Sequence, residues 1–455
     1  MLKKMPSLSL FDQTRYRCLF LTAVLLAFAF SVAAWEHHPL LTEPVLETIS
    51  ETESFTPAAA VTLEDFLSAV EGPLAVFLAE EEAWAREHLP WYAPCPEELD
   101  FVATGNPDDI RARFFQAIRI NPNTKTPLYF SVLSGNDIQG ATLLSPEEFT
   151  LFPDAAALES FDFVSLLPGG VLNAQDIIAT ASNEPDYGMD TGLFEDNDTD
   201  FGRRYGFGLQ PFGNPGLDYG SQAPFHMGFY HESPLVFLFA PFLKRTYPEY
   251  RIHLFKRLSE FAFENDHDYW GWRFMGWGLH YLADLSMPYH TTVLPGYSAL
   301  RMLWINFLDI LGISTPVDNA LQLVSNRHMA IETYQRIVME RALREGSGCA
   351  IFDALNADYD APAYDDNLPR QVLANASNQL ARQMNRTLVK YMPYDFVSNP
   401  ALELGEIEGL ENIVEMVAES HGVQALEELD ALLADALELF AHYGRSYIAD
   451  IISKR

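Results

Sequence analysis

Apolar residues recur at helical spacing along most of the chain, and this pattern predicts a protein built mainly of helices. Apolar positions three and four residues apart mark 63–89, 251–262 and 269–285. The same periodicity returns after residue 333, where it predicts helices over 334–344, 368–392, 404–419 and 423–452. We therefore expect an all-α fold.

Two segments depart from this pattern. Residues 51–180 contain one short β-like run, at 126–133, and several loops marked by Gly and Pro, so we expect an irregular insertion at the surface. Residues 300–313, LRMLWINFLDILGI, are apolar on nearly every side, which predicts a buried helix. A substrate flap or a lipid-contacting element is the alternative for this second segment.

Residues 1–34 have the features of a secretory signal peptide. A basic start is followed by an apolar run from Leu19 to Phe30 and by the small residues Val32-Ala33-Ala34. The apolar run is too short for a comfortable membrane span. We expect cleavage after Ala34, which leaves a secreted or periplasmic chain of 421 residues that begins at Trp35.

The charge of the chain disfavours a general nucleic-acid surface. The net charge is −34, and it becomes −37 when the signal peptide takes four basic residues and one acid with it. Duplex nucleic acid is bound through Lys and Arg, so we expect no duplex partner. Cys95 and Cys349 remain after cleavage and could pair in an oxidising compartment, but the absence of a Cys-x-x-Cys pair leaves metal chemistry to His and carboxylates.

The stretch HYLADLSMPYH, residues 280–290, carries the strongest chemical signal. His280 and Asp284 are four residues apart and so share one face of the predicted helix. Pro288 favours a helix end just before it, which allows His290 to point back at the same place. Two imidazoles and a carboxylate that meet at one point are ligands for zinc or a similar divalent ion.

Other segments offer the same residue types. His328 and Glu332 again lie four apart on one helix face. The acidic loop 183–190 contains Asp186, and the segment 221–226 ends in His226, with His231 as a competing ligand. A second acidic run, 195–200, lacks the spacing of a calcium-binding loop, and we interpret it as exposed.

The string at 280–290 resembles the signature of the zinc-dependent phospholipase C family, whose superfamily includes the fungal single-strand 3'-nucleases. Ala283 stands where that family usually has Gly or Thr. The resemblance implies that the amine and carbonyl of the mature N-terminal Trp35 bind zinc together with a nearby His. His38 fits best because Leu41 and Val45 follow at helical spacing, and His37 is the alternative.

The resemblance also implies a complete site of about three zinc ions. One ion would take His226, His280 and Asp284, with Asp186 near or on it, a second would take His290, His328 and Glu332, and a third would take Trp35, His38 and the bridging Asp284. Asp186, which precedes Tyr187, resembles the family acid that lies at the attacking water, and this makes it the expected catalytic residue as well as a metal neighbour.

These expectations describe a secreted zinc-dependent phosphodiester hydrolase, most similar to phospholipase C, which cleaves the glycerol–phosphate bond of phospholipids and contacts a membrane surface transiently. Glu332 favours lipid, because the nucleases have Asp there, and so does the lack of a Gly-Gly-Asn segment before His328. A nuclease or 3'-nucleotidase on the same metals is the first alternative, and a non-catalytic secreted lipid-binding protein is the second. We expect one catalytic domain over 35–455, with a helical C-terminal part at 333–455; the sequence does not indicate an oligomeric state.

Overall fold

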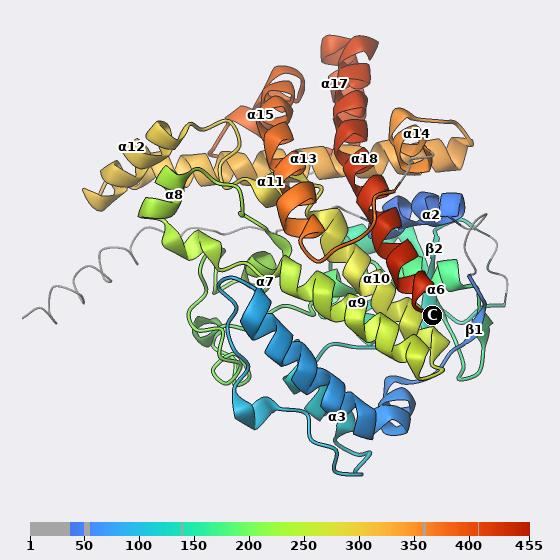
Figure 1. The fold of residues 1–455 in the computed structure, drawn as a ribbon. Coiled ribbons are helices and arrows are strands. Elements are labelled where there is room, and N and C mark those ends of the chain that lie inside the picture. The colour runs from blue at the N-terminus through green and yellow to red at the C-terminus, as the bar shows by residue number, and fades with distance from the viewer. Residues whose placement is uncertain (1–36, 50–54, 137, 139, 358–360, 408) are drawn as a thin grey trace, which may run out of the picture.

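The computed structural model describes residues 37–49, 55–136, 138, 140–357, 361–407 and 409–455 (Figure 1). The fold is mostly helical, as the apolar periodicity predicts. The predicted signal peptide and Trp35 lie outside the described residues. Among the helices of the described chain, none combines the length and the hydropathy that crossing a bilayer requires.

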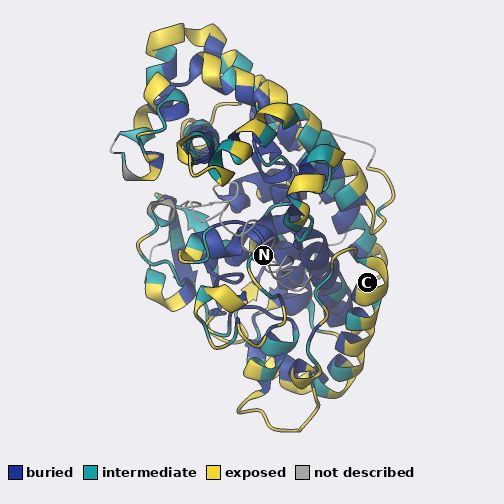
Figure 2. Cartoon of the chain, turned by 90° about the vertical axis from the view of Figure 1, so that its left-hand side faces the viewer, coloured by how far each residue is buried: buried dark blue, intermediate teal, exposed yellow. Residues whose placement is uncertain are grey.

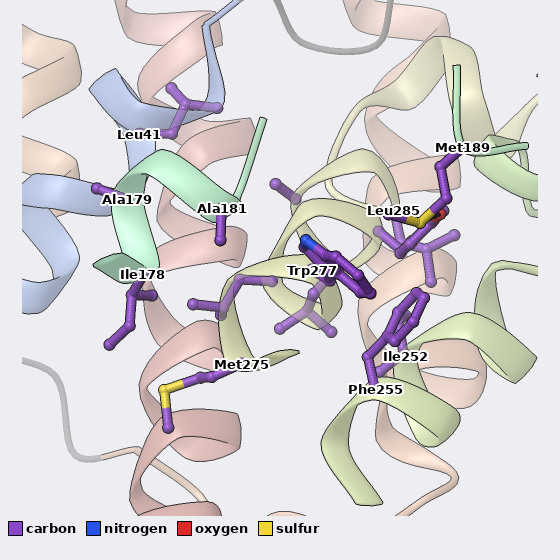
Figure 3. Packing of buried hydrophobic residues seen from close by; sticks show 14 of the residues in the cluster. Leu41, Ile178, Ala179, Ala181, Met189, Ile252, Phe255, Met275, Trp277 and Leu285 are labelled. Carbon is purple, nitrogen blue, oxygen red and sulfur yellow. Dashed lines mark hydrogen bonds between the residues drawn. The ribbon is translucent and has the colours of Figure 1, made fainter. Parts of the chain in front are cut away.

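Two antiparallel helices form the centre of the molecule: α9, Pro248–Glu264, and α10, Asp268–Asp284 (Figure 1). Against them pack α2 (His38–Ile49), α6 (Ala174–Ala181) and the long C-terminal helix α18 (Val423–Ser453). Trp270, Trp272 and Trp277 of α10 are fully buried, and Figure 3 shows Trp277 between residues of α6 and α9. The three tryptophans are therefore core residues, as their density in the sequence predicts.

Glycines let neighbouring helices approach α10 closely. A Cβ on Gly276 would lie 2.5 Å from the carbonyl oxygen of Ile178 in α6, and one on Gly278 would lie 1.8 Å from the hydroxyl of Tyr447 in α18. Real Cβ atoms do not approach other atoms so closely, so these two contacts require Gly. The close packing of α6 and α18 on α10 sets the position of α10 along its axis and its rotation, and α10 carries His280 and Asp284.

The remaining helices surround this centre. Before α9 lie α3 (Leu63–His88), α4 (Ile110–Ala117), α5 (Pro146–Phe149), α7 (Asp218–His226) and α8 (Pro234–Phe239). After α10 lie α11 (Pro288–Thr291), α12 (Ala299–Ile310), α13 (Thr315–Glu345), α14 (Ala350–Asn356), α15 (Ala374–Tyr391), α16 (Tyr394–Ser398) and α17 (Ile413–His421). Single helical turns of 3-10 type cover 97–99, 156–160, 184–187, 195–197, 241–244, 404–406 and 410–412, and a π-type turn covers 368–373.

The strands form two small antiparallel pairs. β2 (Tyr129–Leu133) pairs with β3 (Phe161–Ser165) so that Tyr129 lies opposite Ser165, and β1 (Ala58–Ala59) pairs with β4 (Val171–Leu172). β2 falls inside the run that the sequence marks as β-like. β2 packs against α6 and β1 against α10.

Residues 51–180 are more than the surface insertion that we expected. Leu63 and Phe66 of α3, Phe114 of α4 and Ile178 of α6 are fully buried in the main hydrophobic core. The expectation failed because the loops between these helices dominate the local sequence pattern, while α3 packs on α9, α4 on α3 and α6 on α10.

The burial predicted for 300–313 is wrong. A helix forms there, α12, but Leu300 is 74% and Trp304 60% exposed, whereas Met302 and Ile305 are buried. The helix lies at the edge of the molecule and packs only through its inner face, above a second, smaller core that includes Phe229, Val236 and Val317 (Figure 1). Figure 2 shows exposed residues along the outer helices of this side and buried residues in the middle.

The two cysteines of the described chain are free thiols, with Cys95 buried and Cys349 half-buried. The pairing that the sequence allowed does not occur here. Residues 195–200 form a 3-10 turn and a loop whose Asp198 and Asp200 side chains are fully exposed, as expected for a solvated acidic loop.

Candidate metal centre

Segments far apart in the sequence bring eight potential ligands to one place in the protein interior. They are His38 at the start of α2, Asp186 in the 3-10 turn 184–187, His226 at the end of α7, His280 and Asp284 on α10, His290 on α11, and His328 and Glu332 on α13. The side chain of Asp186 is 19% exposed, and each of the other seven side chains is at most 8% exposed. Asp186 is therefore the member of the set that solvent reaches.

Asp284 lies in the middle of the set. Its Oδ2 is 2.9 Å from Nδ1 of His226 and 3.4 Å from Nε2 of His280, and these two nitrogens are 3.1 Å apart. Its Oδ1 is 3.7 Å from Nε2 of His38 and 3.6 Å from Nδ1 of His290. One carboxylate thus lies within 3.7 Å of four imidazoles and is the central acid of the cluster.

The described residues form three groups that could hold a metal ion, each with one donor atom per residue within 4.8 Å of the others. The groups are His226, His280 and Asp284; His38, Asp186 and His280; and His290, His328 and Glu332. In the second group, Asp186 lies 3.9 Å from His38 and 3.7 Å from His280. In the third, Oε1 of Glu332 lies 2.7 Å from Nε2 of His328 and 4.0 Å from Nε2 of His290.

Backbone carbonyls fix the orientation of two imidazoles. Nδ1–H of His280 donates to the carbonyl oxygen of Ser182 at 2.8 Å, and Nδ1–H of His290 donates to the carbonyl oxygen of His226 at 3.0 Å. A nitrogen that donates to a carbonyl carries the ring proton, so Nε2 of each ring presents its lone pair to the cluster. A second hydrogen bond of this kind is typical of metal-binding histidines.

Several buried donor atoms of the set have no hydrogen-bond partner among the described residues. They include both ring nitrogens of His38, Nε2 of His226, Oδ1 of Asp284 and Nε2 of His290. Leaving a buried polar atom unsatisfied costs about 1–3 kcal/mol. The unprotonated ring nitrogens and the carboxylate oxygen among them can each give a lone pair to a cation, so the set fits bound metal ions.

The protonation states of four of the five imidazoles suit metal binding. Burial, aided by the neighbouring imidazoles, lowers the pKa of His38, His280 and His290 well below the usual range, and burial lowers the pKa of His328 to about 3. These rings are neutral at pH 7, which is the form that coordinates metals. Burial raises the pKa of Asp284 to about 6. Burial would also lower the pKa of His226, but the hydrogen bond and charge of Asp284 outweigh it and raise that pKa.

Asp190 is a buried member of the site to which the sequence assigned no role. Arg251 donates to its Oδ1 from two nitrogens, at 3.0 and 2.6 Å, and the Tyr281 hydroxyl donates to its Oδ2 at 2.5 Å. Oδ2 of Asp190 also lies 3.6 Å from Nε2 of His226. Asp190 thus links His226 to α9 and α10. A second acid four residues after Asp186 was the only sequence signal for it.

The structure separates the alternative ligands. His38 faces the cluster, whereas His37, with a φ of 65°, turns the other way and lies 3.3 Å from Glu340. His226 lies in the cluster, whereas Nε2–H of His231 donates to the carbonyl oxygen of Arg370 at 2.6 Å. Apart from Trp35, every ligand expected from the sequence is therefore found in one cluster.

The chain has no match among protein-family models, curated proteins or solved structures.

Proposed function

We propose that this protein is a zinc-dependent phosphodiester hydrolase, similar to phospholipase C, that cleaves the glycerol–phosphate bond of phospholipids. The observation that carries the proposal is the convergence of His38, Asp186, His226, His280, Asp284, His290, His328 and Glu332 on one buried centre. They occur along the chain in the order that the phospholipase C resemblance implies.

The donor set favours zinc. Neutral imidazoles with carboxylates, and no thiolate in the cluster, are typical of catalytic zinc sites. About three ions would be held, two by the groups around His226 and His290 and a third by His38 with Asp284 and the free amine of Trp35. Zinc bound there would supply Lewis acidity to the phosphate oxygens and lower the pKa of a water molecule.

The side chains divide the remaining work. Asp186 is the most accessible carboxylate of the centre, so it would orient the attacking water and accept its proton. The carbonyls of Ser182 and His226 orient the imidazoles of His280 and His290, and Arg251 holds the carboxylate of Asp190 in position beside the cluster. Such preorganised groups reduce the reorganisation needed as charge develops on the phosphate.

Glu332 at the end of the ligand order and the apolar helix α12 between His290 and His328 support a lipid substrate over a nucleotide. Single-stranded DNA is the competing substrate that an experiment must include. The same metal ions would serve both reactions. The two kinds of enzyme would differ in the residues around the metal centre that bind the substrate.

The test is the activity of the zinc-loaded chain that begins at Trp35 on phosphatidylcholine, sphingomyelin and single-stranded DNA in parallel. We expect diacylglycerol and phosphocholine from phosphatidylcholine, loss of this activity with a chelator, and about three zinc ions per chain by elemental analysis. Cleavage of DNA alone would replace the phospholipase proposal with the nuclease alternative. A protein that binds no zinc and hydrolyses none of the substrates would refute both proposals.

Paired histidine variants sharpen this test. His226→Ala should lose zinc and reduce turnover by at least about a hundredfold, because it removes a donor of the central group. His231→Ala, five residues away, removes only a hydrogen bond to a carbonyl and should retain the zinc content and most of the activity. Equal losses in the two variants would contradict the assignment of His226.

A further inference from the structure

Exposed apolar side chains gather on α8 and α12. Of the 21 large apolar side chains that are exposed in the described part of the chain, eight lie on α8, on α12 or in the turn that follows it. They form what we call the α8–α12 patch: Leu238, Phe239, Leu300, Trp304, Phe307, Ile310, Leu311 and Ile313. The two helices pack on each other and lie side by side at the upper left of Figure 1.

The outer face of α12 is an unbroken apolar stripe. Leu300, Trp304, Phe307 and Leu311 follow one another at steps of four, three and four, which places them along one line of the helix. Met302 and Ile305 cover the opposite side and enter the smaller core. The water-facing side of a surface helix is normally polar, so a helix that is apolar on both sides has an outer face suited to an apolar surrounding.

The segments around α8 and the first part of α12 carry basic residues and no acid, although the chain as a whole is acidic. Residues 233–248 and 291–308 contain no acid, although the chain has 63 acidic residues, and they carry Lys244, Arg245 and Arg301. Lys244 lies over the rings of Trp91 and Phe237, and Arg301 lies over the ring of Tyr297, at 4.1–5.2 Å. Asp309 is nine residues from Leu300 and thus on the other side of α12.

We propose that the α8–α12 patch docks the protein on the surface of a phospholipid bilayer. Leu, Phe and Trp side chains would enter the acyl boundary, and Lys244, Arg245 and Arg301 would face headgroup phosphates. Aromatic residues at a water–lipid boundary are typical of such surfaces. A second copy of the chain is a poorer occupant, because two molecules of net charge −34 repel each other.

The patch is connected to the metal centre through the smaller core. Ala223, one turn before His226, and Leu294, four residues after His290, both belong to that core beneath α12. Docking would therefore bring the bilayer to the side of the centre from which His226 and His290 come. The docking proposal does not depend on hydrolase activity. The delivery of a lipid substrate from the bilayer to the centre rests on the function proposed above.

The test is sedimentation of the purified protein with vesicles of phosphatidylcholine and a minor share of phosphatidylglycerol, in the presence of a chelator that stops hydrolysis. The wild type should bind, and Trp304→Ser/Phe307→Ser should bind at least about tenfold more weakly, because the variant loses the two aromatic side chains that would be buried in the acyl boundary. The matched control is Val171→Ser/Tyr394→Ser, which changes two exposed residues outside the patch, 69% and 73% exposed, and should bind like the wild type.

Two results would overturn the docking proposal. One is vesicle binding that is absent or equal in the patch variant and the wild type. The other is a patch variant that fails only to self-associate in light scattering, which would make a second copy the occupant. Hydrolysis is measured separately, on a soluble short-chain phosphatidylcholine and on vesicles. Patch-dependent binding without any hydrolysis would leave the docking proposal intact and refute the proposed hydrolase activity. A patch variant that hydrolyses the soluble substrate but not vesicles supports both proposals.

Discussion

Single residues of the centre differ in what they can do because they differ in position and exposure. Asp284 is fully buried and within 3.7 Å of four imidazoles, which suits a ligand that holds ions together. Asp186 is close to His38, His226 and His280 but remains partly open to water. Under the proposed function, the two carboxylates would have separate roles in the same pocket, Asp284 in binding ions and Asp186 in the reaction.

Replacing Asp186 by Asn tests the chemical role. The amide keeps the size of the side chain but accepts a proton poorly, so we expect turnover to fall by about 10²–10⁴-fold while most of the zinc remains bound. Zinc content by elemental analysis and the initial rate on phosphatidylcholine are the two measurements. Asp200→Asn changes an exposed acid and should alter neither. Near-normal turnover of Asp186→Asn would remove Asp186 from the reaction.

At the scale of elements, the site depends on helix contacts as much as on ligand identity. The position of His280 and Asp284 along the axis of α10 is set by its packing against α6 and α18, which Gly276 and Gly278 allow. Ser182, just after α6, then supplies the carbonyl that orients His280. Helix packing outside the cluster therefore determines the direction in which the His280 ring points.

Gly278→Ala tests this packing. The new Cβ would meet the Tyr447 hydroxyl, so the unfolding free energy should fall by about 1–3 kcal/mol, and the zinc content should fall with it as α10 shifts. Urea unfolding and elemental analysis provide the readouts. Gly444→Ala on α18 is the control: its Cβ would meet only ordinary contacts at 3.5–3.8 Å, and the better helix propensity of Ala should leave the stability equal or slightly higher. Equal stability of the two variants would show that α10 is free to shift.

The sequence predicts those elements whose signal is local. Helices α3, α9, α10 and α18 follow from apolar periodicity within two or three residues of their ends, and His38 at the start of α2 follows from the spacing to Leu41 and Val45. The role of Asp190 does not follow, because its partners Arg251 and Tyr281 are more than sixty residues away. The exposure of α12 does not follow either, since periodicity records which sides are apolar but not which side finds a neighbour.

At the scale of the whole molecule, one buried carboxylate joins three distant parts of the chain. Oε1 of Glu340 on α13 accepts from the Ser160 hydroxyl at 2.6 Å and lies 3.3 Å from Nε2 of His37, the residue before the site histidine His38. Arg336 and Arg344 of the same helix lie 3.3 and 3.0 Å from its oxygens. These contacts connect the start of α2, the turn before β3 and the helix that carries His328 and Glu332.

Glu340→Gln tests whether this connection stabilises the fold. Burial raises the pKa of Glu340, but the hydrogen bonds from the His37 ring and Ser160 and the charge of Arg336 outweigh it and lower that pKa to about 2, whereas the unfolded chain has the ordinary value near 4.5. A carboxyl with a lowered folded pKa adds stability above the unfolded pKa and loses it as the pH falls through the folded pKa. The variant should therefore be less stable than the wild type by about 1–3 kcal/mol at pH 7, and the difference should shrink between pH 4.5 and pH 2. Urea unfolding at pH 7, 4 and 3 measures this difference in stability.

The control is Glu415→Gln, which breaks an exposed ion pair between Glu415 and Arg341, a residue of α13, and should cost less than about 1 kcal/mol. A loss in the control as large as that of Glu340→Gln would contradict the proposed connection. So would a stability deficit of Glu340→Gln that grows towards acid pH.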